Sequence, residues 1–375
     1  MNSVTAHGTS EHRLDTVVVG GGQAGLAMGY YLRDRGRECL ILDAGEQVGD
    51  AWRGRWDGLR LFTPAALSSL PGLPFPSPGG YFPAKDEMAD YLEGYAGKFD
   101  LPVRLGRRVD SLRRNGNAYL VSAGDERYLA ENVVVATGPY HTPRVPAFAA
   151  QLDPSITQLH SSDYRNPGQL PEGDVLVVGA GNSGAEISLK LAATRHTYLS
   201  GRETGNMPGG VSEHRLSRRL LFGWRIDWWL IGRVTTDTRL GRRAREFDRR
   251  QGTPLIRLGP KDLSAAGVER VPRVEGVVDG KPRLAGGRVL EVGAVVWATG
   301  FVPDFAWIEL PIFDEEGYPI HHRGVIGAAP GLYFLGLPFQ HTFLSATVGG
   351  VGKEVRHVAD HLAQATKREH ELATV

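Results

Sequence analysis

The chain has 375 residues, of which 41% are hydrophobic, and a formal net charge of +1 at pH 7. This length predicts two or three domains with proper cores, and the balanced charge gives no indication of nucleic acid as a partner. The single cysteine, Cys39, excludes an internal disulfide or a Cys-x-x-Cys redox pair and suits a reducing compartment. Because no signal peptide or membrane-length apolar run is found, the sequence predicts a cytoplasmic protein without a membrane span.

Strand-like and helix-like segments alternate along the first part of the chain. Residues 1–14 are expected to form a disordered leader, followed by a strand over 15–19, a helix from Gly25 to near Arg35 and a strand over 38–42. Residues 48–85 are rich in Pro, Gly and aromatic residues, so they are predicted to be a long functional loop. A helix over 86–98 and strands near 103–110, 117–123 and 132–135 follow.

A second alternating region starts after a proline-rich crossover at residues 139–172. It begins with a strand at Val175, a helix over 183–194 and a strand over 196–199, and residues 205–265 are expected to be largely helical. Strands near 289–297 and over 331–335 precede a final helix at about 346–365. Alternating β and α segments in two copies predict an α/β protein with open parallel sheets.

The most informative motif is a glycine fingerprint that occurs twice. Gly20, Gly22 and Gly25 follow the first strand and open the first helix, and Gly179, Gly181 and Gly184 repeat the same spacing in the same context. Such a turn lets the backbone approach a pyrophosphate, which the helix N-terminus then binds through free N–H groups. Two copies predict two Rossmann-like domains that hold two dinucleotides, and hence electron transfer between them.

The residues after the second strand of each unit predict which nucleotide binds where. In the first unit Asp43 would accept a hydrogen bond from a ribose 2′-OH, which suits FAD, although it could instead cap the loop as a turn residue. In the second unit the same place reads Ser200-Gly201-Arg202. Arg202 could fork onto a 2′-phosphate and Ser200 could add a hydroxyl, which favours NADPH, unless Arg202 is simply exposed.

An Ala-Thr-Gly triplet ends an apolar strand in each unit. The triplets are Ala136-Thr137-Gly138 and Ala298-Thr299-Gly300. Small, turn-permissive residues at a strand end allow the chain to pass close to a cofactor or to cross between domains. We therefore include both triplets among the expected cofactor-binding residues.

Together these motifs resemble the flavin-containing monooxygenase family, within the flavoproteins that have two dinucleotide-binding domains. The resemblance runs from Val17 to about Leu362 and is carried by GGGQAG (20–25), GDAW (49–52), ATG (136–138), HSSDYRNP (160–167), GAGNSG (179–184), ATGF (298–301) and GLYFLGLPF (331–339). It implies an FAD domain at 15–165 and 297–375 and an inserted NADPH domain at 166–296, with a helical insertion at about 205–265. It also implies that FAD contacts Gln23, Ala24, Trp52 and Gly336, and that NADPH contacts Asn182 and Ser183.

The same resemblance implies an activity. The family reduces FAD with NADPH, forms a flavin C4a-hydroperoxide with O2 and inserts one oxygen atom into a small organic substrate. Two positions depart from the pattern. The linker signature keeps His160 and Tyr164 but has Pro154 and Ile156 at its first positions, and Phe62, followed by Thr63, stands where the family has an asparagine beside the flavin.

Residues that could wall the flavin come from irregular segments: Trp52, Trp56, Phe62, Phe339, Gln340 and His341, with Thr63 next to Phe62. Gln340 and His341 follow a Gly-Leu-Pro turn, and the histidine could instead have a structural role. The cluster at Trp224, Trp228 and Trp229 could be a substrate lid, a dimer face or core, so a homodimer stays open. The histidines lack the ligand spacing of a metal site. Two other functions remain open: an NADPH-dependent flavin reductase or oxidase that makes H2O2 or passes electrons on, and a non-enzymatic redox-sensing flavoprotein.

Overall fold

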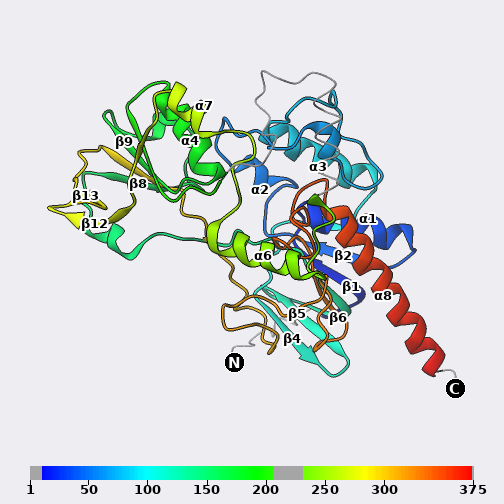
Figure 1. Cartoon of the computed structure of the whole chain (residues 1–375). Coiled ribbons are helices and arrows are strands. Elements are labelled where there is room, and N and C mark those ends of the chain that lie inside the picture. The colour runs from blue at the N-terminus through cyan, green and yellow to red at the C-terminus, as the bar shows by residue number, and fades with distance from the viewer. Residues whose placement is uncertain (1–10, 206–230, 374–375) are drawn as a thin grey trace, which may run out of the picture.

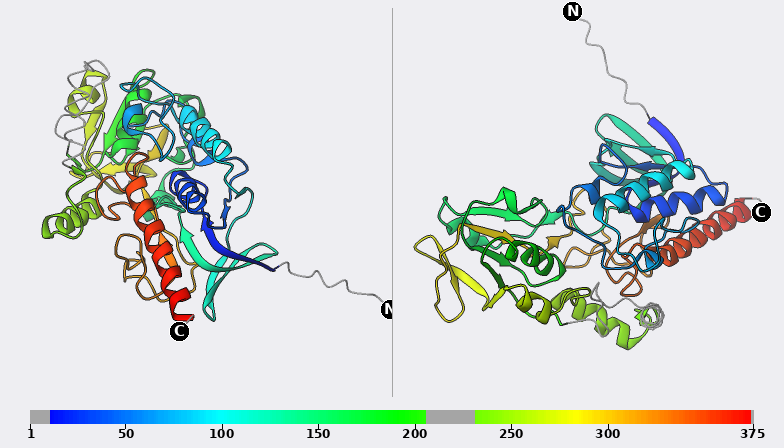
Figure 2. Two further views of the ribbon diagram at one scale, coloured as in Figure 1. Left: turned by 90° about the vertical axis from the view of Figure 1, so that its right-hand side faces the viewer. Right: turned by 90° about the horizontal axis from the view of Figure 1, so that it is seen from above.

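Two α/β domains joined by two crossover segments make up the computed structural model, which describes residues 11–205 and 231–373 (Figure 1). The first domain contains both the N-terminal strand and the long C-terminal helix, and the second is inserted between them in the sequence. Helix α6 (Arg239–Gln251) lies between the two domains in Figure 1 and runs along one side of the molecule in Figure 2. This confirms the predicted fold of two dinucleotide-binding domains, one inserted into the other.

The first domain is built on a seven-stranded sheet in the order β3-β2-β1-β6-β5-β4, with β16 also paired to β6. β1 pairs in parallel with both β2 and β6, whereas β4, β5 and β6 form an antiparallel meander. The strands are β1 (Glu11–Val19), β2 (Cys39–Leu42), β3 (Val103–Arg104), β4 (Ser111–Asn115), β5 (Ala118–Ala123), β6 (Glu126–Val135) and β16 (Leu332–Phe334).

Helices α1 (Gln23–Asp34), α3 (Lys85–Lys98) and α8 (Val351–Ala373) belong to this domain, and the last turn of α1 carries Arg33, which suits the negative C-terminal end of a helix. Their apolar faces contribute, with the sheet, to one buried cluster that includes Leu26, Leu92 and Val355. The expected long loop at 48–85 is confirmed as largely irregular, with the short helices α2 (Asp50–Arg53) and η1 (Ala65–Leu67).

The second domain has a five-stranded parallel sheet in the order β11-β10-β9-β14-β8. β9 and β14 at its centre are buried at every residue, as expected of strands that are covered on both faces. The elements are η2 (Ala147–Gln151), β8 (Thr157–His160), η3 (Pro167–Gln169), β9 (Val175–Val178), α4 (Asn182–Ala192), β10 (Thr197–Ser200), α7 (Pro260–Ala265), β11 (Glu269–Val271), β12 (Val274–Val278), β13 (Lys281–Leu284) and β14 (Ala294–Trp297).

The two crossover segments run side by side as a short antiparallel pair. β7 (Thr142–Pro143) pairs with β15 (Phe301–Val302), and the Arg144 N–H donates to the Gly300 carbonyl over 2.9 Å. His160 joins them, because its Nε2 lies 3.1 Å from the same carbonyl while its Nδ1 accepts from the Ser162 N–H. The passage from one domain to the other is therefore a hydrogen-bonded joint of two strands.

The structure corrects two predicted boundaries. Residues 11–14 belong to β1, so the expected leader at 1–14 is too long at its C-terminal end, and residues 1–10 lie outside the described part of the chain. The first domain was expected to reach residue 165, but β8 pairs with β14 and therefore belongs to the second sheet. Of the expected helical insertion, residues 206–230 lie outside the described residues, as does the tryptophan cluster.

Candidate functional site

The two glycine turns have almost the same backbone geometry. Gly22 at the start of α1 has φ −76° and ψ −171°, and Gly181 at the start of α4 has φ −76° and ψ −174°. In each turn this glycine accepts the first helical hydrogen bond, from the N–H of Leu26 or Ala185, and no side chain caps the helix. Both helices therefore present free N–H groups where an anion can bind.

The second and third glycines of each turn leave room for two different neighbours. A Cβ on Gly25 would lie 1.8 Å from the Gly20 oxygen, and one on Gly184 would lie 1.8 Å from the Gly179 oxygen, so these glycines let helix and strand pack. A Cβ on Gly22 or Gly181 would meet no protein atom within 4 Å. The open space over these two glycines is the cradle that a pyrophosphate would fill, and the turns fit both predicted dinucleotides.

Both Ala-Thr-Gly triplets lie against the glycine turns. The N–H of Ala136 donates to the Val19 oxygen, and the N–H of Ala298 donates to the Val178 oxygen, each over 2.7 Å. The first glycine of each turn packs on the alanine carbonyl: a Cβ on Gly20 would come within 2.7 Å of the Ala136 oxygen. The alanines therefore shape the turns.

The threonine and glycine of each triplet belong to the crossover joint. Thr137 Oγ1 accepts from His141 Nε2 over 3.1 Å, because His141 Nδ1 already accepts from the Asp304 N–H. The Thr299 hydroxyl donates to the Arg144 carbonyl. Gly138 and Gly300 turn the chain with φ of +71° and +82°.

The first unit places a carboxylate beside its glycine turn. Asp43 follows β2 directly, and its two oxygens accept hydrogen bonds from the Gly21 and Gly45 N–H groups. Asp43 is thus a turn residue, which was the alternative interpretation. A carboxylate has about four lone-pair sites, so the same side chain has capacity left for a ribose hydroxyl.

The second unit has no carboxylate at the equivalent place. Val19 is in register with Leu42, and Val178 is in register with Ser200, so Gly201 is the counterpart of Asp43. Gly201 has φ +147°, and a Cβ there would lie 2.7 Å from the Ala180 nitrogen. The position is therefore closed to any side chain, acidic or not.

Of the two predicted phosphate ligands in this unit, only Arg202 is available. Its side chain is exposed and makes no hydrogen bond or ion pair within residues 11–205 and 231–373. Ser200, by contrast, is fully buried, and its hydroxyl donates to the Pro272 oxygen and accepts from the Val274 N–H. The expectation that Ser200 donates to a phosphate is wrong, since its hydroxyl faces the neighbouring strands.

Asn182 in the first turn of α4 holds a segment of protein instead of pointing into the cradle. Its amide nitrogen donates to the Pro254 oxygen, and its oxygen accepts from the Ile256 N–H, both over 3.0 Å. One turn later Glu186 pairs with Arg257 at 3.2 Å. Hydrogen bonds and an ion pair therefore hold residues 254–257 against α4, beside the second glycine turn. The neighbouring Ser183, and Gln23 at the start of α1, are half-buried.

Four residues expected near the flavin lie around α1 and the loop that follows β2. Gly336 lies beside Ala24, since a Cβ on Gly336 would be 3.3 Å from the Ala24 Cβ. Trp52 is half-buried and packs against the core of the first domain. Phe62 is half-buried, whereas Thr63 is buried and its hydroxyl lies 2.8 Å from that of Ser68.

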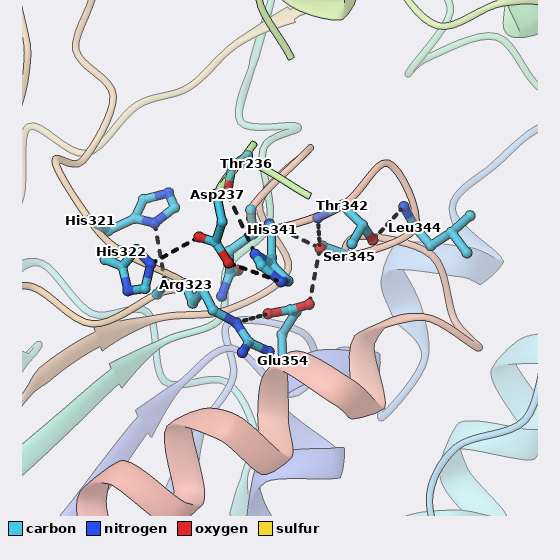
Figure 3. A network of polar contacts seen from close by, with 12 residues as sticks. Thr236, Asp237, His321, His322, Arg323, His341, Thr342, Leu344, Ser345 and Glu354 are labelled. Carbon is cyan, nitrogen blue, oxygen red and sulfur yellow. Dashed lines mark hydrogen bonds and ion pairs between the residues drawn. The ribbon is translucent and has the colours of Figure 1, made fainter. Parts of the chain in front are cut away.

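Gln340 and His341 serve the structure of the chain around them. The Gln340 amide nitrogen donates to the Phe334 oxygen, and its oxygen accepts from the Leu337 N–H, so the predicted flavin-facing role of Gln340 is wrong. The His341 carbonyl accepts from the Thr236 N–H over 2.8 Å, and its ring faces Asp237, as Figure 3 shows. These contacts favour the alternative interpretation, in which His341 has a structural role.

The polar network of Figure 3 continues to the start of α8 and was missed by sequence reasoning. The Ser345 hydroxyl accepts from the His341 and Thr342 N–H groups and donates to Glu354, which is 1% exposed. The other Glu354 oxygen lies 3.6 Å from Arg323 Nε. Burial raises the pKa of Glu354, and the Arg323 charge partly offsets this shift. Sequence gives no signal for this network because Asp237, Arg323 and Glu354 come from three segments that lie far apart in the chain.

The segment after α2 docks onto the second domain, which the sequence also did not predict. Trp56, which was expected to wall the flavin, is instead buried in the core of that domain together with Tyr164, so that expectation is wrong. The Asp57 N–H donates to the Arg165 oxygen, and the Asp57 carboxylate accepts from the Asn166 amide, both over 2.8 Å. A loop of the first domain thus connects it to the domain that carries the second glycine turn.

The remaining expectations concern Cys39, metals and the membrane. Cys39 is buried in β2, and burial, with Asp15 and Glu38 nearby, raises its pKa to about 11. Over residues 11–205 and 231–373, no group of His, Cys, Asp or Glu side chains is arranged to hold a metal. In the same ranges no helix is long and apolar enough to span a membrane.

Comparison with known proteins gives three kinds of likeness. Residues 17–206 match the family model described as pyridine nucleotide-disulphide oxidoreductase. The uncharacterized oxidoreductase CzcO-like of Geobacillus kaustophilus is 40% identical, over 94% of this chain and 99% of that protein. The probable indole-3-pyruvate monooxygenase YUCCA3 of Arabidopsis thaliana is 29% identical over 94% and 87% of the two chains. A solved flavin-containing monooxygenase from Stenotrophomonas maltophilia has a TM-score of 0.73 at 29% identity, covering 95% and 99%.

Proposed function

The chain belongs to the pyridine nucleotide-disulphide oxidoreductase family, and from this premise we propose that it is an NADPH- and FAD-dependent monooxygenase. It is an FAD-dependent oxidoreductase with FAD and NADPH as cofactors, and the predicted resemblance to flavin-containing monooxygenases is confirmed. This class removes the alternative of a non-enzymatic redox sensor. The proposed reaction inserts one atom of O2 into a small organic molecule.

The chemistry of the family's name cannot be the chemistry of this chain. A disulphide reductase needs a pair of redox-active cysteines, and this sequence has one cysteine. That cysteine is buried, and its raised pKa keeps it as an unreactive thiol at neutral pH. Electrons from NADPH therefore need another acceptor, and oxygen is the acceptor that the monooxygenase proposal names.

One observation carries the proposal: two glycine turns of almost the same backbone geometry have different residues beside them. The first turn has Asp43, which would accept from a ribose hydroxyl of FAD, and the second has Gly201 followed by the exposed Arg202. A carboxylate would repel a 2′-phosphate, whereas a guanidinium would bind it. We therefore assign FAD to the first domain and NADPH to the second.

Bound FAD would supply the redox chemistry, by accepting electrons from NADPH and passing them to O2. The protein's share is position and exclusion of water. The N–H groups of α1 and α4 would bind the two pyrophosphates, and the docked Trp56 loop connects the first domain to the second. The Phe62 ring and Trp52 would wall the flavin side of the first domain.

A second function is favoured by one residue. Phe62 is half-buried and offers no hydrogen bond, at a place where an asparagine is expected from the family pattern. Losing one preorganised donor in an active site costs about 2.7–4 kcal/mol. An enzyme without that donor would release H2O2 more readily, as an NADPH oxidase does, so the chain would leak electrons when no good substrate is bound.

The two functions are separated by following oxygen. Purified protein loaded with FAD is given NADPH under ¹⁸O2 with a panel of sulfides, amines and ketones, and NADPH consumption, H2O2 and product mass are measured together. We expect a product that is heavier by one ¹⁸O atom, with H2O2 accounting for the rest of the NADPH. If all NADPH is recovered as H2O2 for every compound, the monooxygenase proposal is wrong and the oxidase takes its place.

A further inference from the structure

Arg55 is a half-buried cation at the joint between the two domains. It follows α2, and its guanidinium carbon lies 5.8 Å from the centre of the Tyr140 ring and 6.0 Å from that of Phe301. Those two rings belong to the two crossover segments and meet edge to face, with centres 5.4 Å apart. Arg55 thus has aromatic neighbours from both crossovers.

The guanidinium of Arg55 has no anionic partner in the described part of the chain. Within residues 11–205 and 231–373 its one hydrogen bond runs from Nε to the Ala51 oxygen over 3.1 Å, and neither terminal nitrogen has a partner there. Burial lowers the pKa of Arg55, the Tyr140 hydroxyl partly offsets this, and the positive charge of Arg165 lowers it further. Arg165 is thus a second cation whose charge acts on Arg55, and its own Nη1 donates to the Ser162 oxygen.

Such an arrangement is unfavourable in the free protein. A partly desolvated charge is costly unless it is paired, and two like charges that lie close together disfavour each other. Arg53, two residues earlier, shows the usual solution, because it pairs with Asp90 at 2.9 Å and Glu93 at 2.7 Å. Arg55 lacks an anionic partner of this kind in the described residues, and a bound ligand can supply one.

The location of Arg55 points to the reaction site. Tyr140 follows Gly138 by two residues and Phe301 follows Gly300 directly, so both rings leave the carboxyl ends of the sheets beside the glycine turns. In open α/β sheets, ligands bind in the crevice outside the carboxyl ends of the strands. Arg55 therefore lies where the two predicted nucleotides and a substrate would converge.

We propose that Arg55 forms an anion subsite at the domain joint and binds the carboxylate of the substrate. The inference rests on the proposed function and names its substrate class as small carboxylic acids with an apolar body. A guanidinium fork matches a carboxylate, and the Tyr140 and Phe301 rings give the apolar body a surface to pack on. The pyrophosphates have their own sites at Gly22 and Gly181, which leaves the Arg55 fork for a different anion.

The test compares two sulfides that differ by one carboxylate, thioanisole and 4-(methylthio)benzoate, as substrates of the FAD-loaded enzyme with saturating NADPH. In the native enzyme we expect the acid to have the lower KM. In Arg55→Met we expect its KM to rise roughly 10- to 100-fold, as for loss of a charge-assisted hydrogen bond, with kcat and the thioanisole constants changed less than about threefold. Arg55→Lys, which keeps the charge but loses the fork, should fall between them.

Arg53→Met is the matched control, because it removes an arginine of the same short segment that already has carboxylate partners. We expect it to leave the ratio of the two KM values unchanged. If Arg55→Met raises the KM of NADPH and leaves that ratio at its native value, the guanidinium serves a cofactor phosphate and the proposal is overturned. An equal rise in KM for both sulfides overturns it as well.

A binding measurement separates this inference from the oxygenation chemistry. Benzoate is titrated into the oxidised, FAD-loaded enzyme without NADPH, and the change in flavin absorbance or the heat of binding is followed. We expect saturable binding that weakens roughly 10- to 100-fold in Arg55→Met. This result would support the subsite even if no sulfide is oxygenated. Binding of benzoate that is equal in the native protein and Arg55→Met would overturn it, whatever the enzyme does with oxygen.

Discussion

Replacing Gly22 by valine separates what the first glycine turn does for FAD from what it does for the fold. A Cβ on Gly22 meets no protein atom within 4 Å, and its φ of −76° is accessible to any residue. The protein alone therefore tolerates the side chain. The free energy of unfolding of the FAD-free protein should change by less than about 1 kcal/mol, the scale of a helix N-cap substitution.

The expected loss is in FAD affinity. The valine side chain fills the space above the α1 N-terminus and keeps the pyrophosphate from the free N–H groups. Each hydrogen bond to a charged group contributes roughly 1.5–3 kcal/mol, so losing two weakens FAD binding by roughly 10²- to 10⁴-fold. The purified variant should be colourless, and its FAD affinity can be measured by quenching of flavin fluorescence during reconstitution.

Gly25→Ala is the contrasting variant. Its new Cβ would lie 1.8 Å from the Gly20 oxygen, so α1 must move away from β1. Overpacking of this kind typically costs 1–3 kcal/mol or more, and urea unfolding of the FAD-free protein should show it. If Gly22→Val keeps native FAD affinity, or loses as much stability as Gly25→Ala, the assignment of the open cradle to the pyrophosphate is refuted.

Three further predictions follow from single side chains. Arg202→Ala should raise the KM for NADPH roughly 10- to 100-fold and leave that for NADH nearly unchanged, because the exposed guanidinium would lose only a 2′-phosphate; equal losses would show a structural role. The pKa of Cys39 is raised from 9.0 to about 11, so the folded protein favours the neutral thiol. About 2–3 kcal/mol of unfolding free energy, fully present below pH 9, should therefore be lost as the pH rises through 11. Cys39→Ala should abolish this part of the pH dependence of stability, measured by urea unfolding. Arg323→Met should lower the free energy of unfolding by about 3–5 kcal/mol, because Glu354 stays buried without its cation. Adding Glu354→Gln to Arg323→Met should recover part of this loss. If the stability changes of the two substitutions simply add in the double variant, the two side chains do not interact.

The features that could be predicted from the sequence are those fixed by short stretches of chain. The glycine turns, the small triplets at the strand ends and the absence of a carboxylate after β10 depend on neighbours within one strand–turn–helix unit. For this reason the predicted doubled fold is confirmed, and the geometry of Gly22 and Gly181 agrees with the prediction.

What could not be predicted depends on contacts between distant segments. Ser200 was expected to face a phosphate, but its direction is set by Pro272 and Val274, which lie about 70 residues away in the sequence. Gln340 bonds within its own turn, and Trp56 is buried in the core of the other domain. Nothing in the sequence indicates a role for Arg55, because only the structure shows that this arginine lacks an acidic partner among the described residues.

The difference between the two nucleotide sites is built into the backbone as well as into the side chains. In the first unit the residue after the second strand is Asp43, whose carboxylate accepts a hydrogen bond from the glycine turn. In the second unit it is Gly201, with φ +147°, and a Cβ on Gly201 would lie 2.7 Å from the Ala180 nitrogen. An aspartate at Gly201 would face both an unfavourable conformation and a clash. A substitution at Gly201 therefore cannot supply a ribose-binding carboxylate, so no charge at this position repels a 2′-phosphate, and the attraction for that phosphate has to come from Arg202.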